Sequence, residues 1–411
     1  MKVCDAIMGS GKTMAAITEM NERTDTRFVF VTPYLDEVHR ICVGCEGRRF
    51  VAPDADVCGT KLRHFKSLVR AGRNVACSHA LFRDYDAEAV EDIASVGYTL
   101  ILDESIAAME VLPVGKKDVC LMLASGLIQV DERGRVIWAD DEYDGAYSVL
   151  REPIDSGYVT LEEGRLLLWM LPLRLFEAFD EVIILTYLFE AQPLHYYFKS
   201  HDVHLDYIGT KKDADGTYRF AEYHADQKMR LPQIHILEDK KLNSIGDKRT
   251  ALSVGWYQRA SNADISRIAK NMYNALRHRF GGKSVECLWT TYVDYRRALN
   301  GRGYSKGYST WNMRATNKWS DRTCLAYLVN VFPHPSLGQF FASKGITLDQ
   351  DAWALSGMVQ WICRSAIRRG EEIWIYVPSS RMRGLLKKWI KEVSIDPDEQ
   401  DLYENREQSN I

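Results

Sequence analysis

Short apolar runs alternate with segments of helical periodicity along the first part of the chain. The runs are rich in β-branched residues and have the length of buried strands, and the segments between them repeat apolar residues three or four positions apart. The predicted strands are 27–33, 74–77, 98–103 and 182–186, and the first two predicted helices are 14–20 and 35–42. This alternation predicts a parallel α/β sheet.

A second series of the same kind follows after about residue 245. It consists of predicted strands at 284–289, 325–330 and 373–377, with predicted helices around 261–280 and 352–369. Polar residues dominate 209–233, so we place the connection between two domains near 230–245. The prediction is a first domain over 1–235, a second over 236–395 and an acidic tail over 396–411.

Residues 106–180 have a less regular pattern and are predicted to be an insertion in the first domain. Two apolar segments, 127–130 and 135–138, flank Asp131-Glu132-Arg133-Gly134, which is typical of a β-hairpin. A wedge or lid is one interpretation of this hairpin, and a plain structural hairpin is the other.

Composition adds a general class to this picture. The 411 residues are 46% hydrophobic and 27% charged, as in ordinary globular proteins. A net charge of −3 means that any nucleic-acid partner must meet a local basic patch. Nine cysteines with no recognisable signal peptide indicate free thiols in a reducing cytoplasm. No apolar run approaches the roughly 18 residues that span a membrane.

The strongest chemical signal is the segment Ala6-Ile7-Met8-Gly9-Ser10-Gly11-Lys12-Thr13. It follows an apolar stub and precedes a helical run, as in a phosphate-binding loop. Backbone N–H groups at Gly9, Ser10 and Gly11 would face phosphate oxygens, and the helix N-terminus adds positive partial charge. Lys12 would reach the β- and γ-phosphates, and the Thr13 hydroxyl would hold Mg²⁺. The segment therefore predicts ATP and Mg²⁺ as ligands.

An acidic pair supports this prediction. The apolar run 98–102 ends in Asp103 and Glu104, at the edge of a parallel sheet where ligands bind. Asp103 would hold the hydrated Mg²⁺, and Glu104 would orient or deprotonate the attacking water.

Two basic segments lie in the second half. Residues 292–322 interleave cations, among them Arg302, Lys306 and Arg314, with aromatic residues, as expected for contact with phosphates and bases. The alternative is an ordinary basic loop with core aromatics.

In 360–369, a predicted helix would place Gln360, Arg364 and Arg368 on one face, where two guanidinium groups suit a polyphosphate. The alternative there is a solvated basic face.

The order of these segments resembles that of superfamily 2 helicases of the DEAD/DEAH type. The similar segments are Ala6–Thr13 (motif I), Phe30–Pro33 (Ia), Leu102–Ser105 (II), Leu185–Tyr187 (III) and Gln360–Arg369 (VI). Residues 32–38, 314–317 and 360–368 also resemble helicase-like proteins encoded by bacteriophages.

The resemblance implies two RecA-like domains in tandem, with ATP in the cleft and single-stranded nucleic acid across both. It implies that Gln360, Arg364 and Arg368 reach the γ-phosphate from the second domain and that Thr186 couples hydrolysis to movement. It implies nucleic-acid contacts at Thr32 and Pro33, beside those expected at Arg302, Lys306 and Arg314.

The sequence therefore predicts an ATP-dependent DNA helicase or translocase of phage replication or recombination, working in the bacterial host cytoplasm. Its expected partners are single-stranded or forked DNA and replication proteins, with no membrane. Two alternatives stay open: an RNA helicase of the same architecture, and a nucleotide-switched binding protein without unwinding activity.

Overall fold

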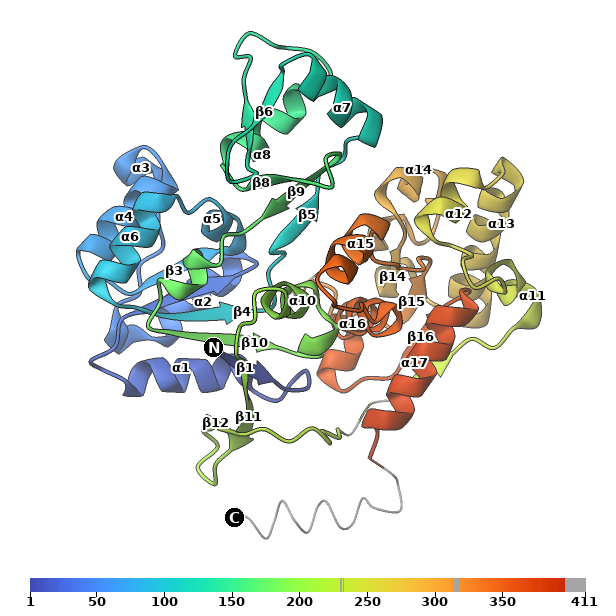
Figure 1. The fold of residues 1–411 in the computed structure, drawn as a ribbon. Coiled ribbons are helices and arrows are strands. Elements are labelled where there is room, and N and C mark those ends of the chain that lie inside the picture. The colour runs from blue at the N-terminus through green and yellow to red at the C-terminus, as the bar shows by residue number, and fades with distance from the viewer. Residues whose placement is uncertain (230, 232, 314–317, 396–411) are drawn as a thin grey trace.

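The computed structural model describes residues 1–229, 231, 233–313 and 318–395. It contains two sheets side by side and a smaller unit that projects from the first (Figure 1). The N-terminal strand lies inside the first sheet, and the second sheet is built only from residues after 233.

The first sheet has seven strands in the order β12-β11-β1-β10-β4-β2-β3. All neighbours are parallel except β11 and β12, which form an antiparallel hairpin at one edge. The strands are β1 (Lys2–Asp5), β2 (Phe28–Thr32), β3 (Val75–Ser78), β4 (Thr99–Asp103), β10 (Glu181–Thr186), β11 (Asp206–Lys212) and β12 (Tyr218–Glu222). The predicted strands of the first half are confirmed, and the hairpin in the polar segment was not predicted.

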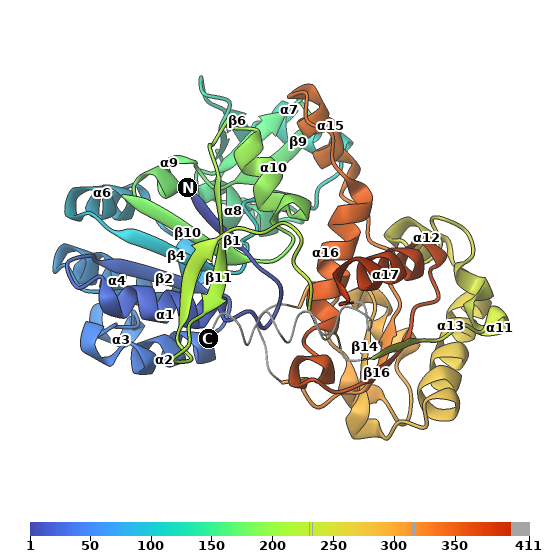
Figure 2. The ribbon, with the colours of Figure 1, turned by 90° about the horizontal axis from the view of Figure 1, so that it is seen from below.

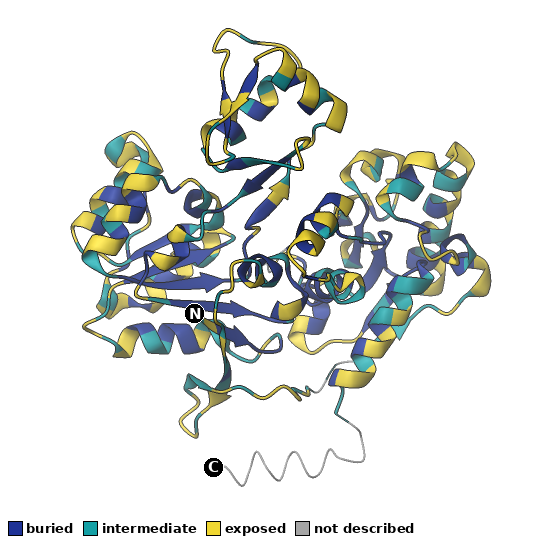
Figure 3. Ribbon diagram, viewed as in Figure 1, coloured by how far each residue is buried: buried dark blue, intermediate teal, exposed yellow. Residues whose placement is uncertain are grey.

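Alternating side chains on these strands face two separate hydrophobic clusters. In β2, Val29 and Val31 join one cluster, whereas Phe28 and Phe30 join the other. The cluster with Phe28 and Phe30 includes residues of α1 (Lys12–Glu22) and α2 (Leu35–Gly44), which cover that face. The opposite face is covered by α4 (Lys61–Arg70), α5 (His79–Arg83), α6 (Ala87–Val96), α9 (Arg174–Glu177) and α10 (Pro193–Lys199), and α3 (Ala55–Cys58) packs beside α4. Figure 3 shows the resulting pattern of buried strands and exposed outer helix faces.

The insertion carries a three-stranded sheet and a hairpin. The predicted hairpin is confirmed, because β6 (Ile128–Val130) and β7 (Val136–Trp138) pair in antiparallel fashion around Gly134, whose φ of 77° suits glycine. The other elements are β5 (Met109–Val111), α7 (Lys116–Ala124), α8 (Arg151–Asp155), β8 (Val159–Glu162) and β9 (Leu166–Met170). The sheet order β5-β9-β8 was not predicted.

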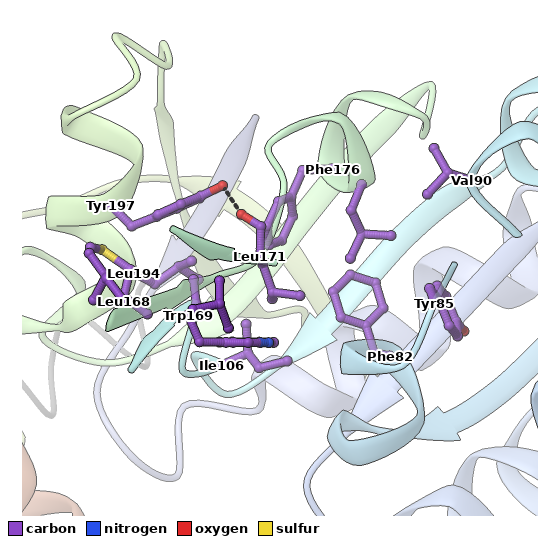
Figure 4. Close-up of a cluster of buried hydrophobic side chains, with 14 of the residues drawn as sticks. Phe82, Tyr85, Val90, Ile106, Leu168, Trp169, Leu171, Phe176, Leu194 and Tyr197 are labelled. Atoms are coloured by element: carbon purple, nitrogen blue, oxygen red, sulfur yellow. Dashed lines mark hydrogen bonds between the residues drawn. The ribbon is translucent and has the colours of Figure 1, made fainter. Parts of the chain in front are cut away.

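Buried side chains join the insertion to the first domain. Figure 4 shows Leu168 and Trp169 of β9 in one cluster with Phe82 and Phe176. The Tyr197 hydroxyl of α10 donates a hydrogen bond to the Leu171 carbonyl at 2.5 Å. The insertion is therefore packed against the first domain through a shared core.

The second sheet is parallel, with the order β13-β16-β15-β14. Its strands are β13 (Ile234–Ile236), β14 (Cys287–Thr290), β15 (Cys324–Tyr327) and β16 (Ile373–Tyr376). Its helices are α11 (Lys240–Asn243), α12 (Val254–Arg259), α13 (Asn262–Tyr273), α14 (Arg296–Leu299), α15 (Pro335–Ser343), α16 (Gln350–Ile362) and α17 (Ser380–Val393). The three predicted strands are confirmed, although 284–286 form a 3-10 turn; β13 was not predicted.

These elements confirm the predicted class, two tandem RecA-like parallel-sheet domains with a hairpin-bearing insertion in the first. The chain passes from the first sheet to the second between β12 and β13, and Figure 2 shows this passage from below. The predicted acidic tail, 396–411, lies outside the described residues. Within the described ranges, no helix is long and apolar enough to cross a membrane.

Candidate nucleotide site between the two sheets

The predicted phosphate-binding loop lies between β1 and α1, at the carboxyl edge of the first sheet. Gly9 and Gly11 have φ values of 85° and 82°, a conformation that glycine adopts without a steric penalty. The Lys12 ammonium donates hydrogen bonds to the carbonyl oxygens of Ala6, at 2.5 Å, and Ile7, at 3.0 Å. The loop therefore curls around its own lysine, and burial lowers the pKa of Lys12.

The acidic pair lies at the end of β4, where Asp103 is the last residue of the strand and Glu104 follows it. In the sheet, β10 separates β4 from β1. The Asp103 carboxylate is buried and accepts hydrogen bonds from the Thr13 hydroxyl at 3.5 Å and the Thr32 hydroxyl at 3.4 Å. Glu104 has a φ of 64°, unusual for a residue other than glycine, and its N–H donates to the Leu185 carbonyl at 2.9 Å. Backbone strain of this kind is concentrated at functional sites.

Burial raises the pKa of Asp103 to about 7, and the negative charges of Glu104 and Glu37 add to this rise. An unfolded aspartate titrates near 3.9, so the folded state holds an extra proton between about pH 4 and pH 7. Stability should consequently fall as the pH rises through this range and stay low above it.

Asp103→Asn should therefore stabilise the metal-free protein more at pH 8 than at pH 4.5. Each kcal/mol of added stability would raise the melting temperature by roughly 2–4 °C. Thermal melts of both forms at the two pH values check this, with the exposed Asp36→Asn as a matched control. An equal shift at both pH values would contradict the assigned burial of the charge.

Arg364 reaches this centre from the second domain, where it follows the end of α16. Its guanidinium Nη2 lies 2.5 Å from Glu104 Oε1, and only 8% of the residue is exposed. The two residues are 260 positions apart, so this ion pair joins the domains directly at the predicted catalytic carboxylate.

The predicted continuous helix over 360–369 is wrong. Helix α16 ends at Ile362, and a separate 3-10 turn spans Ala366–Arg369. The Arg364 and Ser365 N–H groups donate only three residues back, to the Trp361 and Ile362 carbonyls. The Ala366 N–H then donates to the Arg322 carbonyl at 2.9 Å, a tertiary bond in place of a helical one. Gly370 ends the 3-10 turn in the left-handed conformation, with a φ of 78° that glycine adopts without a steric penalty.

The break separates the three residues that were expected on one face. Gln360 is buried within α16, Arg364 is buried at the ion pair, and Arg368 is exposed on the turn. Desolvation lowers the pKa of Arg368, and the positive charge of Arg364 lowers it further. The second effect shows that Arg368 lies within electrostatic reach of Arg364.

The predicted coupling residue lies behind the phosphate loop. Thr186 is buried at the end of β10; its carbonyl accepts from the Ala6 N–H at 3.1 Å, and its hydroxyl accepts from the Gln192 amide at 2.9 Å. The next residue, Tyr187, accepts from Trp389 Nε1 of α17 at 3.1 Å. One short segment thus touches both the loop and the second domain.

The predicted nucleic-acid residues are dispersed. Thr32 is fully buried against Asp103, which argues against a nucleic-acid contact through its side chain, and Pro33 is half-buried. Arg302 and Lys306 are exposed, whereas Arg314 lies outside the described residues.

The aromatic residues of the basic segment 292–322 are largely structural. Tyr304 and Trp319 are buried, and the Tyr304 hydroxyl donates to the Leu299 carbonyl at 2.9 Å. For these two rings the structure favours the alternative interpretation, core aromatics, because both rings fill the core of the second domain.

Sequence reasoning missed three polar side chains at the centre. Glu37 forms an ion pair with Arg40 at 2.9 Å and raises the pKa of Asp103. Gln192 holds Thr186, and Gln227 bonds the backbone of the phosphate loop. Glu37 follows the predicted strand 27–33 by four residues, a signal that could have been used; isolated glutamines carry no such pattern.

Two buried polar atoms indicate whether a polyphosphate fits the site between the two domains. Within the described part of the chain, Ser10 Oγ and Arg364 Nε have no hydrogen-bond partner. Both belong to residues predicted to contact phosphate, and anionic oxygens would satisfy them. The Thr13 hydroxyl and the Asp103 carboxylate are oxygen ligands of the kind that Mg²⁺ prefers beside phosphates. The residues present therefore fit ATP and Mg²⁺.

Comparisons with known proteins find similar sequences and similar solved structures. Residues 228–390 match the model of the YonV C-terminal Rossmann-like domain, and residues 109–169 match that of the YonV middle domain. Among solved structures, the chain is similar to an XPD helicase (TM-score 0.48, 12% identity) and to S. tokodaii Xpd4 (TM-score 0.49, 11% identity). Each alignment covers 96% of both chains, and at such identities it concerns the fold alone.

One curated relative extends along nearly the whole chain. It is the SPbeta prophage-derived uncharacterized protein YonV of Bacillus subtilis (strain 168), with 37% identity over 408 residues. The alignment covers 95% of this chain and 98% of the relative, and it supports the predicted resemblance to phage-encoded proteins. The chain belongs to the YonV family.

Proposed function

We propose that the protein is an ATPase that moves along or unwinds DNA in phage replication or recombination. The observation that carries this proposal is the ion pair of Arg364 with Glu104 at 2.5 Å. It brings a cation of the second domain to the predicted catalytic carboxylate, beside Asp103. Such an arrangement suits hydrolysis that depends on the position of two domains.

The residues have distinct roles in this proposal. The amides of Gly9, Ser10 and Gly11, with Lys12, bind the phosphates, and Thr13 and Asp103 would hold Mg²⁺. The metal would neutralise phosphate charge and fix its geometry. Glu104 orients the attacking water and accepts its proton.

Arg364 has to exchange partners for this chemistry. While its guanidinium pairs with Glu104, the carboxylate oxygen Oε1 is bonded to Arg364 and is not available to the attacking water. A γ-phosphate near Arg364 would compete for the guanidinium and free Glu104 for the water. Arg364 then offsets the charge that develops in the transition state.

A physical route for coupling starts at the phosphate loop. Ile7 of the loop and Tyr187 after β10 belong to the same hydrophobic cluster as Trp389 and Met358 of the second domain. Movement of the loop would therefore be transmitted through this cluster to α16 and α17. This contact supports Thr186 and its neighbours as the coupling segment.

Arg302 and Lys306 are the described candidates for nucleic-acid contact. Replacing both with alanine should reduce the salt dependence of single-stranded DNA binding by about 1.4 in logarithmic slope, at roughly 0.7 per lost phosphate contact. Binding measured over a series of salt concentrations tests this, with the exposed pair Lys387→Ala and Lys388→Ala as a charge-matched control. An unchanged slope would move the nucleic-acid path elsewhere.

The proposed activity is tested by phosphate release with Mg²⁺ and ATP, alone and with single-stranded DNA, duplex DNA or RNA. We expect single-stranded DNA to stimulate most strongly and the Lys12→Ala protein to give the background. Stronger stimulation by RNA would assign the protein to RNA. Hydrolysis indifferent to all three would favour a nucleotide-switched binding protein, and no hydrolysis under any condition would contradict the proposal.

A further inference from the structure

The β11–β12 hairpin and the segment that follows it make three separate contacts with the phosphate loop. The Thr210 hydroxyl donates to the Ser10 carbonyl at 2.9 Å. The Gln227 amide donates to the Asp5 carbonyl at 2.6 Å and accepts from the Ile7 N–H at 2.7 Å. The Tyr218 ring lies against Gly11 so closely that a Cβ added to Gly11 would be 2.1 Å from Tyr218 Cδ1.

The position of the hairpin in the sheet indicates which part of a nucleotide it would meet. The strand order is β11-β1-β10-β4, so the hairpin and the acidic pair lie on opposite sides of the loop strand β1. Asp103, Glu104 and Arg364 mark the side of the metal and the terminal phosphate. A triphosphate laid along the loop would then direct its nucleoside over β11 and β12, which lie beside α1 in Figures 1 and 2.

The chemistry of the hairpin suits a nucleobase. Tyr218 is half-buried, and Lys212 Nζ lies over its ring, 5.7 Å from the centroid. An aromatic ring beside a cation is a stacking surface that accepts any base. The strand is also held in place, because Arg219 pairs with Glu22 of α1 at 2.5 Å and with Asp213 at 2.8 Å.

We propose that the β11–β12 hairpin is the nucleobase platform of this site and that Tyr218 stacks on the base of the bound nucleotide. The inference rests on the proposed function, because it assumes that a nucleoside triphosphate binds the loop. Gln227 acts as a positioning residue, since both functional atoms of its amide are used by the loop backbone.

The test compares ATP with inorganic tripolyphosphate, which has the phosphates but no base. Calorimetric titrations with Mg²⁺ would use the wild type, Tyr218→Ala and Tyr218→Phe, with the exposed Tyr273→Ala of α13 as control. Tyr218→Ala should weaken ATP about tenfold or more, while tripolyphosphate stays within about twofold. Tyr218→Phe keeps the ring and should bind both ligands within about twofold of the wild type.

A second variant covers the case in which Tyr218→Ala does not fold. In Tyr218→Trp, ATP should quench the emission of the added indole, measured as the difference from the wild type, and tripolyphosphate should not. Equal weakening of both ligands by Tyr218→Ala, unchanged ATP affinity in that variant, or quenching by both ligands would overturn the platform. Failure of the wild type to bind either ligand would instead overturn the proposed function, and the platform with it.

Discussion

Lys12→Ala should reduce ATP turnover by at least about 10²-fold, the effect of removing one strong electrostatic contact to the reacting group. The Lys12 ammonium sits inside the phosphate loop, where it bonds the carbonyls of Ala6 and Ile7. Two opposing effects keep the stability change small. Loss of these bonds costs about 1 kcal/mol each, and removal of a partly desolvated charge offsets part of this cost.

Steady-state phosphate release and thermal melting would measure the two effects of Lys12→Ala together. The exposed Lys61→Ala of α4 is a control for the loss of one positive charge. Turnover close to the wild-type value in a folded Lys12→Ala protein would mean that the loop does not bind the reacting phosphates.

Arg364→Ala is the second substitution with a large expected effect. Arginines that stabilise phosphoryl transfer contribute roughly 10³–10⁵ in rate, so turnover should fall by a factor in this range. Nucleotide affinity should stay within about tenfold, or 1.4 kcal/mol, because the charge acts mainly on the transition state. The substitution also removes the ion pair with Glu104.

Comparison with the nearby arginines separates catalysis from general charge. Arg368→Ala should have a smaller effect than Arg364→Ala, because Arg368 is exposed on the 3-10 turn and Arg364 is buried at the centre. Arg369, on the same turn, pairs with Glu371 two residues further along the chain, so Arg369→Ala is the matched control. Equal effects of all three would indicate a generally basic surface.

Local sequence patterns predicted the elements that carry the chemistry. The loop 6–13 and the acidic pair follow buried strands, and both have strong residue-type signals, so their places at one sheet edge could be expected. The hairpin of the insertion was also predictable, because Asp131–Gly134 has the residues that such a turn requires.

Tertiary contacts explain what the patterns missed. Residues 360–369 contain no proline or glycine that would end a helix. The helix stops because the Arg364 and Ser365 N–H groups bond only three residues back and the Ala366 N–H bonds the Arg322 carbonyl, which is distant in sequence. The same holds for Tyr304 and Trp319, whose burial depends on the packing of the second sheet. The β11–β12 hairpin was not predicted, because its residues are only partly buried and a polar strand at the edge of a sheet resembles a loop in sequence.

The central claim is that groups from both sheets act on one bound nucleotide, and a double-mutant cycle tests it most directly. Single-turnover ATP hydrolysis would be measured for the wild type, Glu104→Gln, Arg364→Ala and the double variant, with Mg²⁺ and saturating single-stranded DNA. Residues that act as a unit are strongly non-additive, so the double variant should be about as slow as the slower single variant. Rate losses that multiply, or a wild-type rate in Arg364→Ala, would contradict a shared site.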